Sequence, residues 1–308
     1  MFTPNEMCEW NPIWDDYFSE VSSSRRLNAC RVRAGNSCGS GSFVGVHNGG
    51  ALILSNAHVT GSKVGSTSTF QFDSSVSSQV RSGRIIMAGY STRVTADWSV
   101  SLIPDWVPGI KPAWCSRQRP TGSQSFMTTG SPSCVWPLRH QQGLRIISNN
   151  NAGFAVWSQP AVPGQSGSAV WDMETEWQQL LLTWRTGNGN GAGQPLDYIW
   201  GQAQAAIQTG VLIGGPKPDD VVELTDVHPD CEEGFFAEMS LRSLPIWFED
   251  QQPEPPTEPD NPNEPCLPKS SQIEAWRRVQ SEAVKMIAEL EGQSDVPVNP
   301  PVGPTFGL

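Results

Sequence analysis

Short runs of alternating apolar and polar residues, separated by turns rich in glycine and serine, fill the middle of the chain. Residues 42–46 and 51–54 flank the turn sequence Asn48-Gly49-Gly50, which is typical of a β-hairpin. The same pattern predicts further strands at 30–33, 68–72, 84–88, 95–103, 125–129, 143–148, 154–158 and 179–184. The chain therefore contains a β-rich body, which we place at residues 29–213.

Helical patterns are few and lie toward the ends of this body or outside it. Residues 199–209 predict a short closing helix. Residues 271–291 repeat apolar positions every three or four residues after a capping box formed by Ser271 and Glu274, and Gly292 follows. This pattern predicts an amphipathic helix that folds back on the body, associates with itself or captures a partner protein.

Composition and charge divide the remaining sequence. The 29 glycines and 26 prolines among 308 residues favour an all-β fold with many turns. The net charge is −3 over residues 1–28, +5 over 29–213 and −13 over 214–308. The expected organisation is an acidic N-terminal extension (1–28), the β body (29–213), an acidic proline-rich linker (214–268), the amphipathic helix (269–292) and a disordered tail (293–308).

The charge pattern leaves two interpretations of the acidic segment open. It either docks on the mildly basic body or remains solvated. Basic residues are scattered and form no Lys/Arg run, so we expect no nucleic-acid partner.

The cysteines and the termini bear on compartment and cofactors. Seven cysteines with no CxxC pair signal neither a zinc site nor a complete set of disulfides, so reduced thiols and no metal or other cofactor are expected. The first residues lack the basic and apolar regions of a secretory signal, and no stretch approaches the roughly 18 apolar residues of a membrane helix. A soluble, intracellular protein without membrane contact is the expectation.

One serine stands between glycines in the sequence Gly164-Gln165-Ser166-Gly167-Ser168. A serine hydroxyl is a weak nucleophile, so such a site needs a base, a group that orients the base, and donors for an oxyanion. His58 follows a strongly apolar strand, and Asp97 stands at the start of another. Each also has an ordinary alternative, a core histidine and a turn aspartate, and Ser168 is a competing nucleophile.

The order His58, Asp97, Ser166 and the surrounding motifs resemble the chymotrypsin-fold (trypsin-like) serine peptidases, over roughly residues 29–213. The matching blocks are residues 39–44 with 54–58, the strand that begins near Asp97, and residues 164–168. The resemblance implies two six-stranded antiparallel β-barrels followed by a short helix. It is greatest with compact bacterial and viral members, and the serine motif has features of glutamyl endopeptidases.

The resemblance also implies a role for each matching residue. Ser166 would be the nucleophile, His58 the general base and Asp97 its orienting partner, with Asp73 and Asp105 as nearby alternatives for the aspartate. The backbone N–H groups of Gly164 and Ser166 would form the oxyanion hole. The residues implied to bind substrate are Pro160 and Ala161 at the pocket base and Thr183, Trp184 and Arg185 on the strand that pairs with the peptide.

Several positions depart from the family pattern. Gln165 replaces the aspartate that pairs with a freed N-terminus, so activation by that ion pair is not expected. Val59 replaces a cysteine that is usually disulfide-bonded. Leu182 replaces the histidine associated with glutamate specificity, and Arg185 stands where glycine is common. Together with the small residues at 160–161, these differences predict a P1 side chain that is small, apolar or acidic and not basic.

Three functions follow from this pattern. The leading one is a serine endopeptidase that acts on protein or peptide substrates through an acyl-enzyme. A second is a self-processing protease that cuts its own linker. A third is a catalytically silent, peptidase-like binding or scaffold module.

Overall fold

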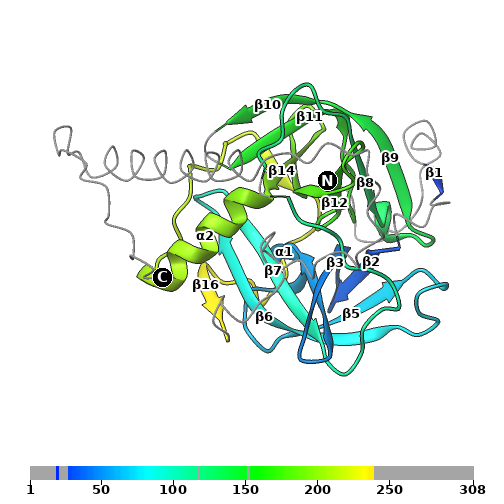
Figure 1. The fold of residues 1–308 in the computed structure, drawn as a ribbon. Helices are drawn as coiled ribbons and strands as arrows, with labels where there is room; N and C mark the ends of the chain where they lie inside the picture. The colour runs from blue at the N-terminus through cyan, green and yellow to red at the C-terminus, as the bar shows by residue number, and fades with distance from the viewer. Residues whose placement is uncertain (1–18, 21–26, 117, 151–152, 239–308) are drawn as a thin grey trace, which may run out of the picture. The chain divides into compact units, whose positions relative to one another are not determined.

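The computed structural model describes residues 19–20, 27–116, 118–150 and 153–238. The predicted helix at 269–292 and the tail at 293–308 lie outside these ranges, as does most of the N-terminal extension. The described part is mostly β, as predicted, with two sheets that meet around a shared core (Figure 1).

The first sheet is a closed six-stranded barrel. Its strands are β2 (Ala29–Ala34), β3 (Ser37–His47), β4 (Gly50–Ser55), β5 (Thr67–Phe72), β6 (Arg81–Ser91) and β7 (Ala96–Ile103). They run in the order β6-β5-β2-β3-β4-β7, and antiparallel pairing of β7 with β6 closes the barrel. Phe43, Ile53 and Phe70 fill it and are fully buried. Burial of each such side chain contributes about 1.5–3 kcal/mol.

The second sheet contains β1 (Ser19–Glu20), β8 (Phe126–Gly130), β9 (Arg139–Leu144), β10 (Ile146–Asn150), β11 (Phe154–Pro160), β12 (Ala169–Asp172), β13 (Gln178–Thr186), β14 (Asn190–Pro195) and β15 (Val221–Glu223). The path is β1-β9-β8-β12-β13-β14-β11-β10, with β15 on β13. This sheet is a curled half-barrel, so the prediction of a second closed barrel is wrong. The edge of β9 that could close it pairs with β1, through Ser19 opposite His140.

Three helical elements lie within the part of the chain that the structure describes. The one-turn helix α1 (Ala57–Thr60) follows β4, and the 3-10 turn η4 (Pro132–Cys134) follows β8. Helix α2 (Leu196–Thr209) confirms the predicted closing helix and ends at Gly210, which has a φ of 71°. Its buried residues join one core cluster with residues of both sheets, namely Leu54, Val100, Leu181, Leu196 and Ile199.

The first part of the expected linker belongs to the ordered body. Strand β15 pairs with the second sheet, and β16 (Gly234–Ala237) pairs with β6 of the barrel. Glu238 forms an ion pair with Arg84, so the acidic segment docks on the body at this point. Both strands lie within the segment that the sequence predicted as a linker, because strands of three and four residues leave too short a pattern in an acidic, proline-rich sequence.

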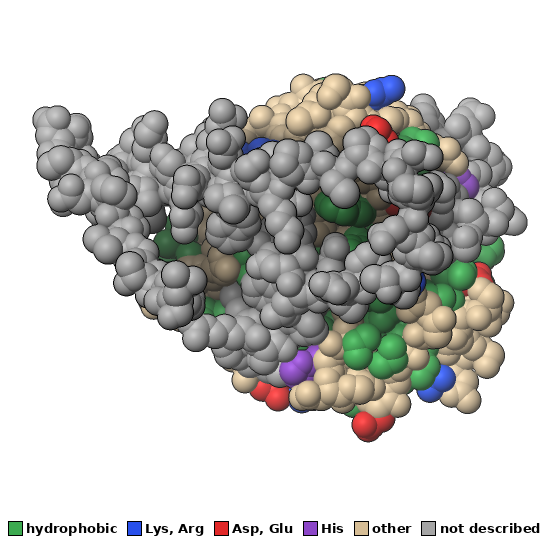
Figure 2. Space-filling view, viewed as in Figure 1, with side chains coloured by type: hydrophobic (Ala, Val, Ile, Leu, Met, Phe, Trp, Pro, Cys, Tyr) green, Lys and Arg blue, Asp and Glu red, His purple; other side chains and the backbone are tan. Residues whose placement is uncertain are grey.

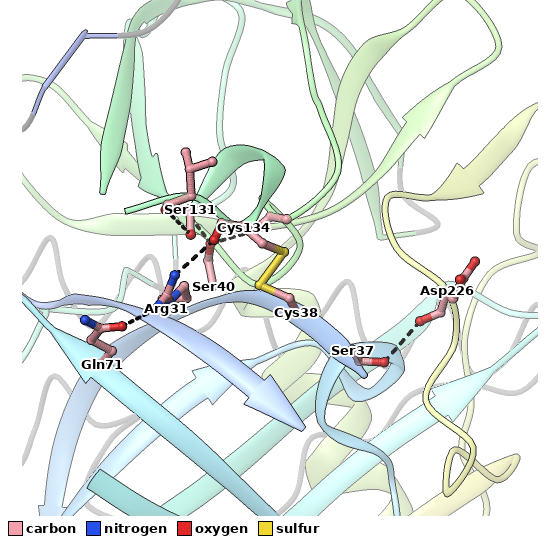
Figure 3. The surroundings of a disulfide bond; sticks show 10 residues. Arg31, Ser37, Cys38, Ser40, Gln71, Ser131, Cys134 and Asp226 are labelled. Atoms are coloured by element: carbon pink, nitrogen blue, oxygen red, sulfur yellow. Dashed lines mark hydrogen bonds between the residues drawn. A yellow bond between two sulfur atoms is a disulfide. The ribbon is translucent and has the colours of Figure 1, made fainter. Parts of the chain in front are cut away.

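The expectation of reduced thiols is wrong for two of the cysteines. Cys38 of β3 and Cys134 of η4 form a disulfide, with their Cα atoms 6.0 Å apart (Figure 3). It joins the barrel to the second sheet across 96 residues of sequence, a separation at which spacing carries no signal. Cys30, Cys115 and Cys231 are free.

The described surface shows no concentration of positive charge on the face drawn in Figure 2, where Lys and Arg side chains stand singly among polar and apolar ones. Within the same residues, no helix is long and apolar enough to cross a bilayer.

Candidate active site

The structure brings His58, Asp97 and Ser166 together at the junction of the two sheets. His58 lies on α1, Asp97 near the start of β7, and Ser166 on the turn before β12. The distance from His58 Nδ1 to Asp97 Oδ2 is 2.5 Å, and that from His58 Nε2 to Ser166 Oγ is 2.7 Å. The backbone N–H of His58 also donates a hydrogen bond to Asp97 Oδ1 at 3.0 Å. The three groups thus form one continuous line of hydrogen bonds.

Asp97 is held by two buried amides that the sequence did not single out. Asn56 Nδ2 and Gln194 Nε2 donate to the Asp97 carbonyl oxygen at 2.6 and 2.8 Å, and Gln194 Oε1 accepts from the Asp97 N–H. Both amides also donate to Thr183 Oγ1. This network fixes the start of β7, and with it the carboxylate that faces His58.

The other two candidate aspartates are placed differently. Asp73 accepts hydrogen bonds from the backbone and hydroxyl of Ser75 in an exposed turn. Asp105 is exposed, with a φ of 53° in the turn after β7. Among the three aspartates, only Asp97 contacts His58.

Two glycines shape the turn that carries Ser166. Gly164 and Gly167 have φ values of 85° and 84°, which side chains rarely adopt. A Cβ on Gly167 would lie 2.1 Å from the carbonyl oxygen of Ser40, and one on Gly164 would lie 2.4 Å from that of Ser131. The turn is therefore pressed against β3 on one side and the η4 region on the other.

Ser40 fastens the turn to the barrel. Its N–H donates to the Ser166 carbonyl oxygen at 2.7 Å, and its hydroxyl donates to the Gly164 carbonyl oxygen at 2.9 Å. These two acceptors are used by the protein, whereas the N–H groups of Gly164 and Ser166 meet no acceptor within the residues that the structure describes. Both N–H groups are therefore left as free donors in the turn that carries the Ser166 hydroxyl.

Ser168 is buried, and its hydroxyl has no partner among the described residues. Its backbone N–H donates to the Gln165 carbonyl oxygen, and its carbonyl oxygen accepts from the Leu182 N–H. The residue therefore leads into β12 and has no base beside its hydroxyl.

The predicted substrate-binding residues gather next to this turn. Pro160 ends β11, and the buried Ala161 donates its N–H to the Gly189 carbonyl oxygen at 3.1 Å. Thr183 and Trp184 on β13 are fully buried, and Arg185 is half-buried without an ion pair inside the described ranges. Pro160 and Ala161 thus lie at the end of β11, and Thr183, Trp184 and Arg185 lie on β13, the strand that bonds to the nucleophile turn through Leu182.

Charged groups approach the site from the C-terminal segment. Burial acts to raise the pKa of Glu223, but the hydrogen bond and charge of Lys217, with a weaker contribution from His58, lower it overall. The Lys217 Nζ lies 2.5 Å from Glu223 Oε1. Burial lowers the pKa of His228, and the charge of Asp230 partly opposes this. The described residues contain no cluster of His, Cys, Asp or Glu suited to a metal ion.

Comparison with solved structures returns serine proteases at low identity. The Rv3671c protease of Mycobacterium tuberculosis, in its inactive form, is 12% identical with a TM-score of 0.46, over 59% of this chain and 90% of that one. A Glu endopeptidase is 13% identical with a TM-score of 0.45, over 58% and 90%. A serine endoprotease of Yersinia pestis is 17% identical with a TM-score of 0.47, over 62% and 69%.

No family model and no curated protein matches the sequence. The likeness to the solved structures is too distant to carry an argument about chemistry, so the site is interpreted from its own geometry.

Gln165 offers a test of what holds the turn in place. The side chain is buried, and its Oε1 accepts a hydrogen bond from the Val162 N–H at 2.8 Å. Gln165→Leu leaves that buried N–H unsatisfied, so we expect the free energy of unfolding to fall by about 1–3 kcal/mol. Urea denaturation measures the change. The same substitution at the exposed Gln204 on α2 is the matched control, and equal stabilities for the two variants contradict the proposed role.

Proposed function

We propose that this protein is a serine endopeptidase. The observation that carries the proposal is the buried line of hydrogen bonds from Asp97 through His58 to Ser166. A carboxylate, an imidazole and a hydroxyl in that order allow the imidazole to accept the serine proton while the carboxylate stabilises the resulting charge. The two free N–H groups beside Ser166 add the donors that a tetrahedral oxyanion requires.

The reaction follows from these positions. Ser166 Oγ attacks the carbonyl carbon of a peptide bond, and its proton passes to His58 Nε2. The carbon–nitrogen bond then breaks, the leaving amine takes that proton, and Ser166 retains the acyl group. Water, deprotonated by His58, releases the acid and restores the hydroxyl.

The surroundings of Ala161 support a P1 preference that is not basic. Ala161 belongs to a buried apolar cluster that also includes Trp157, Leu180 and Leu182. A Lys or Arg side chain placed among these apolar groups would lose its hydration. An apolar P1 side chain fits these surroundings best.

A peptide-library digest tests the proposed function. Over a long incubation, the full chain is expected to cleave library peptides after apolar residues, and Ser166→Ala is expected to cleave none. Efficient cleavage after Lys or Arg contradicts the P1 preference. Equal cleavage by the wild-type chain and Ser166→Ala contradicts the endopeptidase proposal and leaves the silent binding module as the better interpretation.

A further inference from the structure

The substrate-facing edge of β13 is occupied by the chain itself. Strand β15 pairs with it in antiparallel fashion, with Val221 opposite Thr186, Val222 opposite Arg185 and Glu223 opposite Trp184. This is the edge that the sequence predicted would bind a peptide. Further along β13, Leu182 accepts from the Gly167 N–H at 2.8 Å and donates to the Ser168 carbonyl oxygen at 2.9 Å, which joins the strand directly to the nucleophile turn.

The register leads the segment toward Ser166. The pairing ends with Glu223 opposite Trp184, and the chain bends at Leu224 and Thr225, directly before Leu182 and Thr183 would be reached along β13. The Leu224 side chain is 3% exposed and packs in the cluster that contains Ala161 and Leu182. A buried apolar side chain of this chain therefore packs in the same cluster as Ala161, the residue proposed for the base of the P1 site.

Beyond Leu224 the segment crosses to the barrel. Ser37 Oγ on β3 donates to the Asp226 carbonyl oxygen at 3.3 Å, next to the disulfide between Cys38 and Cys134 (Figure 3). The His228 N–H donates to the His58 carbonyl oxygen at 2.8 Å. The segment thus passes from one side of the site to the other, and His58 and Ser166 are both 0% exposed.

Both ends of the segment are anchored. On its N-terminal side, Gly215 accepts from the Thr95 N–H at 2.9 Å, and Pro216 forms a β-bridge with Val94. On its C-terminal side, β16 pairs with four residues of β6, and Glu233 accepts from the Thr92 N–H at 2.9 Å. A segment held at both ends covers the site without loss of much further chain entropy.

We propose that residues 221–226 are an internal pseudosubstrate: β15 pairs with the substrate-facing edge of β13, Leu224 occupies the P1 site, and the segment slows the enzyme by holding it in a closed state that opens only transiently. This proposal rests on the endopeptidase function proposed above. The free N–H groups of Gly164 and Ser166 favour inhibition over self-cleavage. A carbonyl poised for attack would accept their hydrogen bonds, and the described residues place no acceptor there.

Labelling of Ser166 by a fluorophosphonate tests the proposal in the full chain. Attack by Ser166 Oγ forms a phosphorus–oxygen bond and expels fluoride, so the labelling rate reports access to the activated hydroxyl. Leu224→Asp places a charge in the apolar pocket, and we expect it to raise the labelling rate by about tenfold or more through a shift toward the open state. Leu224→Ala should give a smaller rise.

Val227→Asp is the matched control, because Val227 is 42% exposed and lies outside the pseudosubstrate. It should label at the wild-type rate. Hydrogen exchange of residues 183–186 provides a second measurement in the same variants. Their amides should exchange faster in both Leu224 variants than in the wild-type chain, and a variant that fails to fold is recognised by fast exchange throughout the barrel.

The outcomes separate this inference from the proposed function. If the wild-type chain labels as fast as both Leu224 variants, the pseudosubstrate is refuted and the endopeptidase stands. If exchange rises in the Leu224 variants but no chain is labelled at Ser166, the segment occupies the cleft and the endopeptidase proposal fails. If the wild-type chain cuts itself between Leu224 and Thr225 and Ser166→Ala does not, the segment is a substrate and the inhibitory role is overturned.

Discussion

Ser166→Ala is expected to lower kcat for peptide hydrolysis by about 10⁶-fold, the loss typical when the nucleophile of such a site is removed. Ser166 Oγ lies 2.7 Å from His58 Nε2, and no other described serine hydroxyl shares that contact. Alanine leaves His58 and Asp97 without a group to deprotonate. The measurement is the initial rate on an apolar-P1 peptide, made in the Leu224→Asp background so that the cleft is open.

Ser168→Ala is the control for this prediction. The Ser168 hydroxyl is buried without a partner, so its removal should leave most of the activity. The opposite pattern, with activity lost in Ser168→Ala and retained in Ser166→Ala, would show that the nucleophile has been assigned to the wrong residue.

Asp97→Asn is expected to lower kcat by about 10⁴-fold while the fold is retained. Asp97 Oδ2 accepts a hydrogen bond from His58 Nδ1, and this contact fixes the tautomer in which Nε2 can accept the serine proton. An amide nitrogen at that position favours the wrong tautomer and cannot stabilise the imidazolium. The measurement is kcat on the same apolar-P1 peptide in the Leu224→Asp background.

The half-buried Asp73, in a surface turn, supplies the matched substitution for this prediction. Asp73→Asn changes an aspartate in a surface turn and should leave kcat unchanged. A wild-type rate in Asp97→Asn, or a large loss in Asp73→Asn, contradicts the orientation that we propose for His58.

The barrel strands and the residues His58, Asp97 and Ser166 each carry a local signal in the sequence. Alternating apolar positions predict strands. The glycines at 164 and 167 predict a tight turn, and both have a positive φ in the structure. The histidine and aspartate follow or begin apolar strands. These features are visible within a few residues, and the structure then brings the strand ends together.

The residues that hold Asp97 in place carry no such local signal in the sequence. Asn56 and Gln194 act on the backbone of Asp97 from 41 and 97 residues away, and a buried amide resembles any other amide in a sequence. The disulfide between Cys38 and Cys134 likewise joins residues that are 96 positions apart in the sequence. Contacts between distant segments depend on tertiary packing, so local patterns could not identify them.

The sequence did not predict that residues 221–226 pair with β13, and the reason is a different one. Residues 221–226 lie in a stretch whose acidic and proline-rich composition predicts a linker, and β15 is only three residues long. Its stability comes from the β13 edge and from burial of Leu224. The open second sheet was also not predicted from the sequence. The two residues of β1 pair with the edge of β9, and a strand of two residues leaves no recognisable pattern.

Mass spectrometry of the phosphonylated protein tests the central claim most directly. The Leu224→Asp chain is incubated with a fluorophosphonate and digested, and the modified residue is identified by fragmentation of the peptide that contains both Ser166 and Ser168. Our account predicts one adduct, on Ser166, which is lost in His58→Ala. An adduct on Ser168, or an adduct on Ser166 that persists at the same rate in His58→Ala, would contradict it.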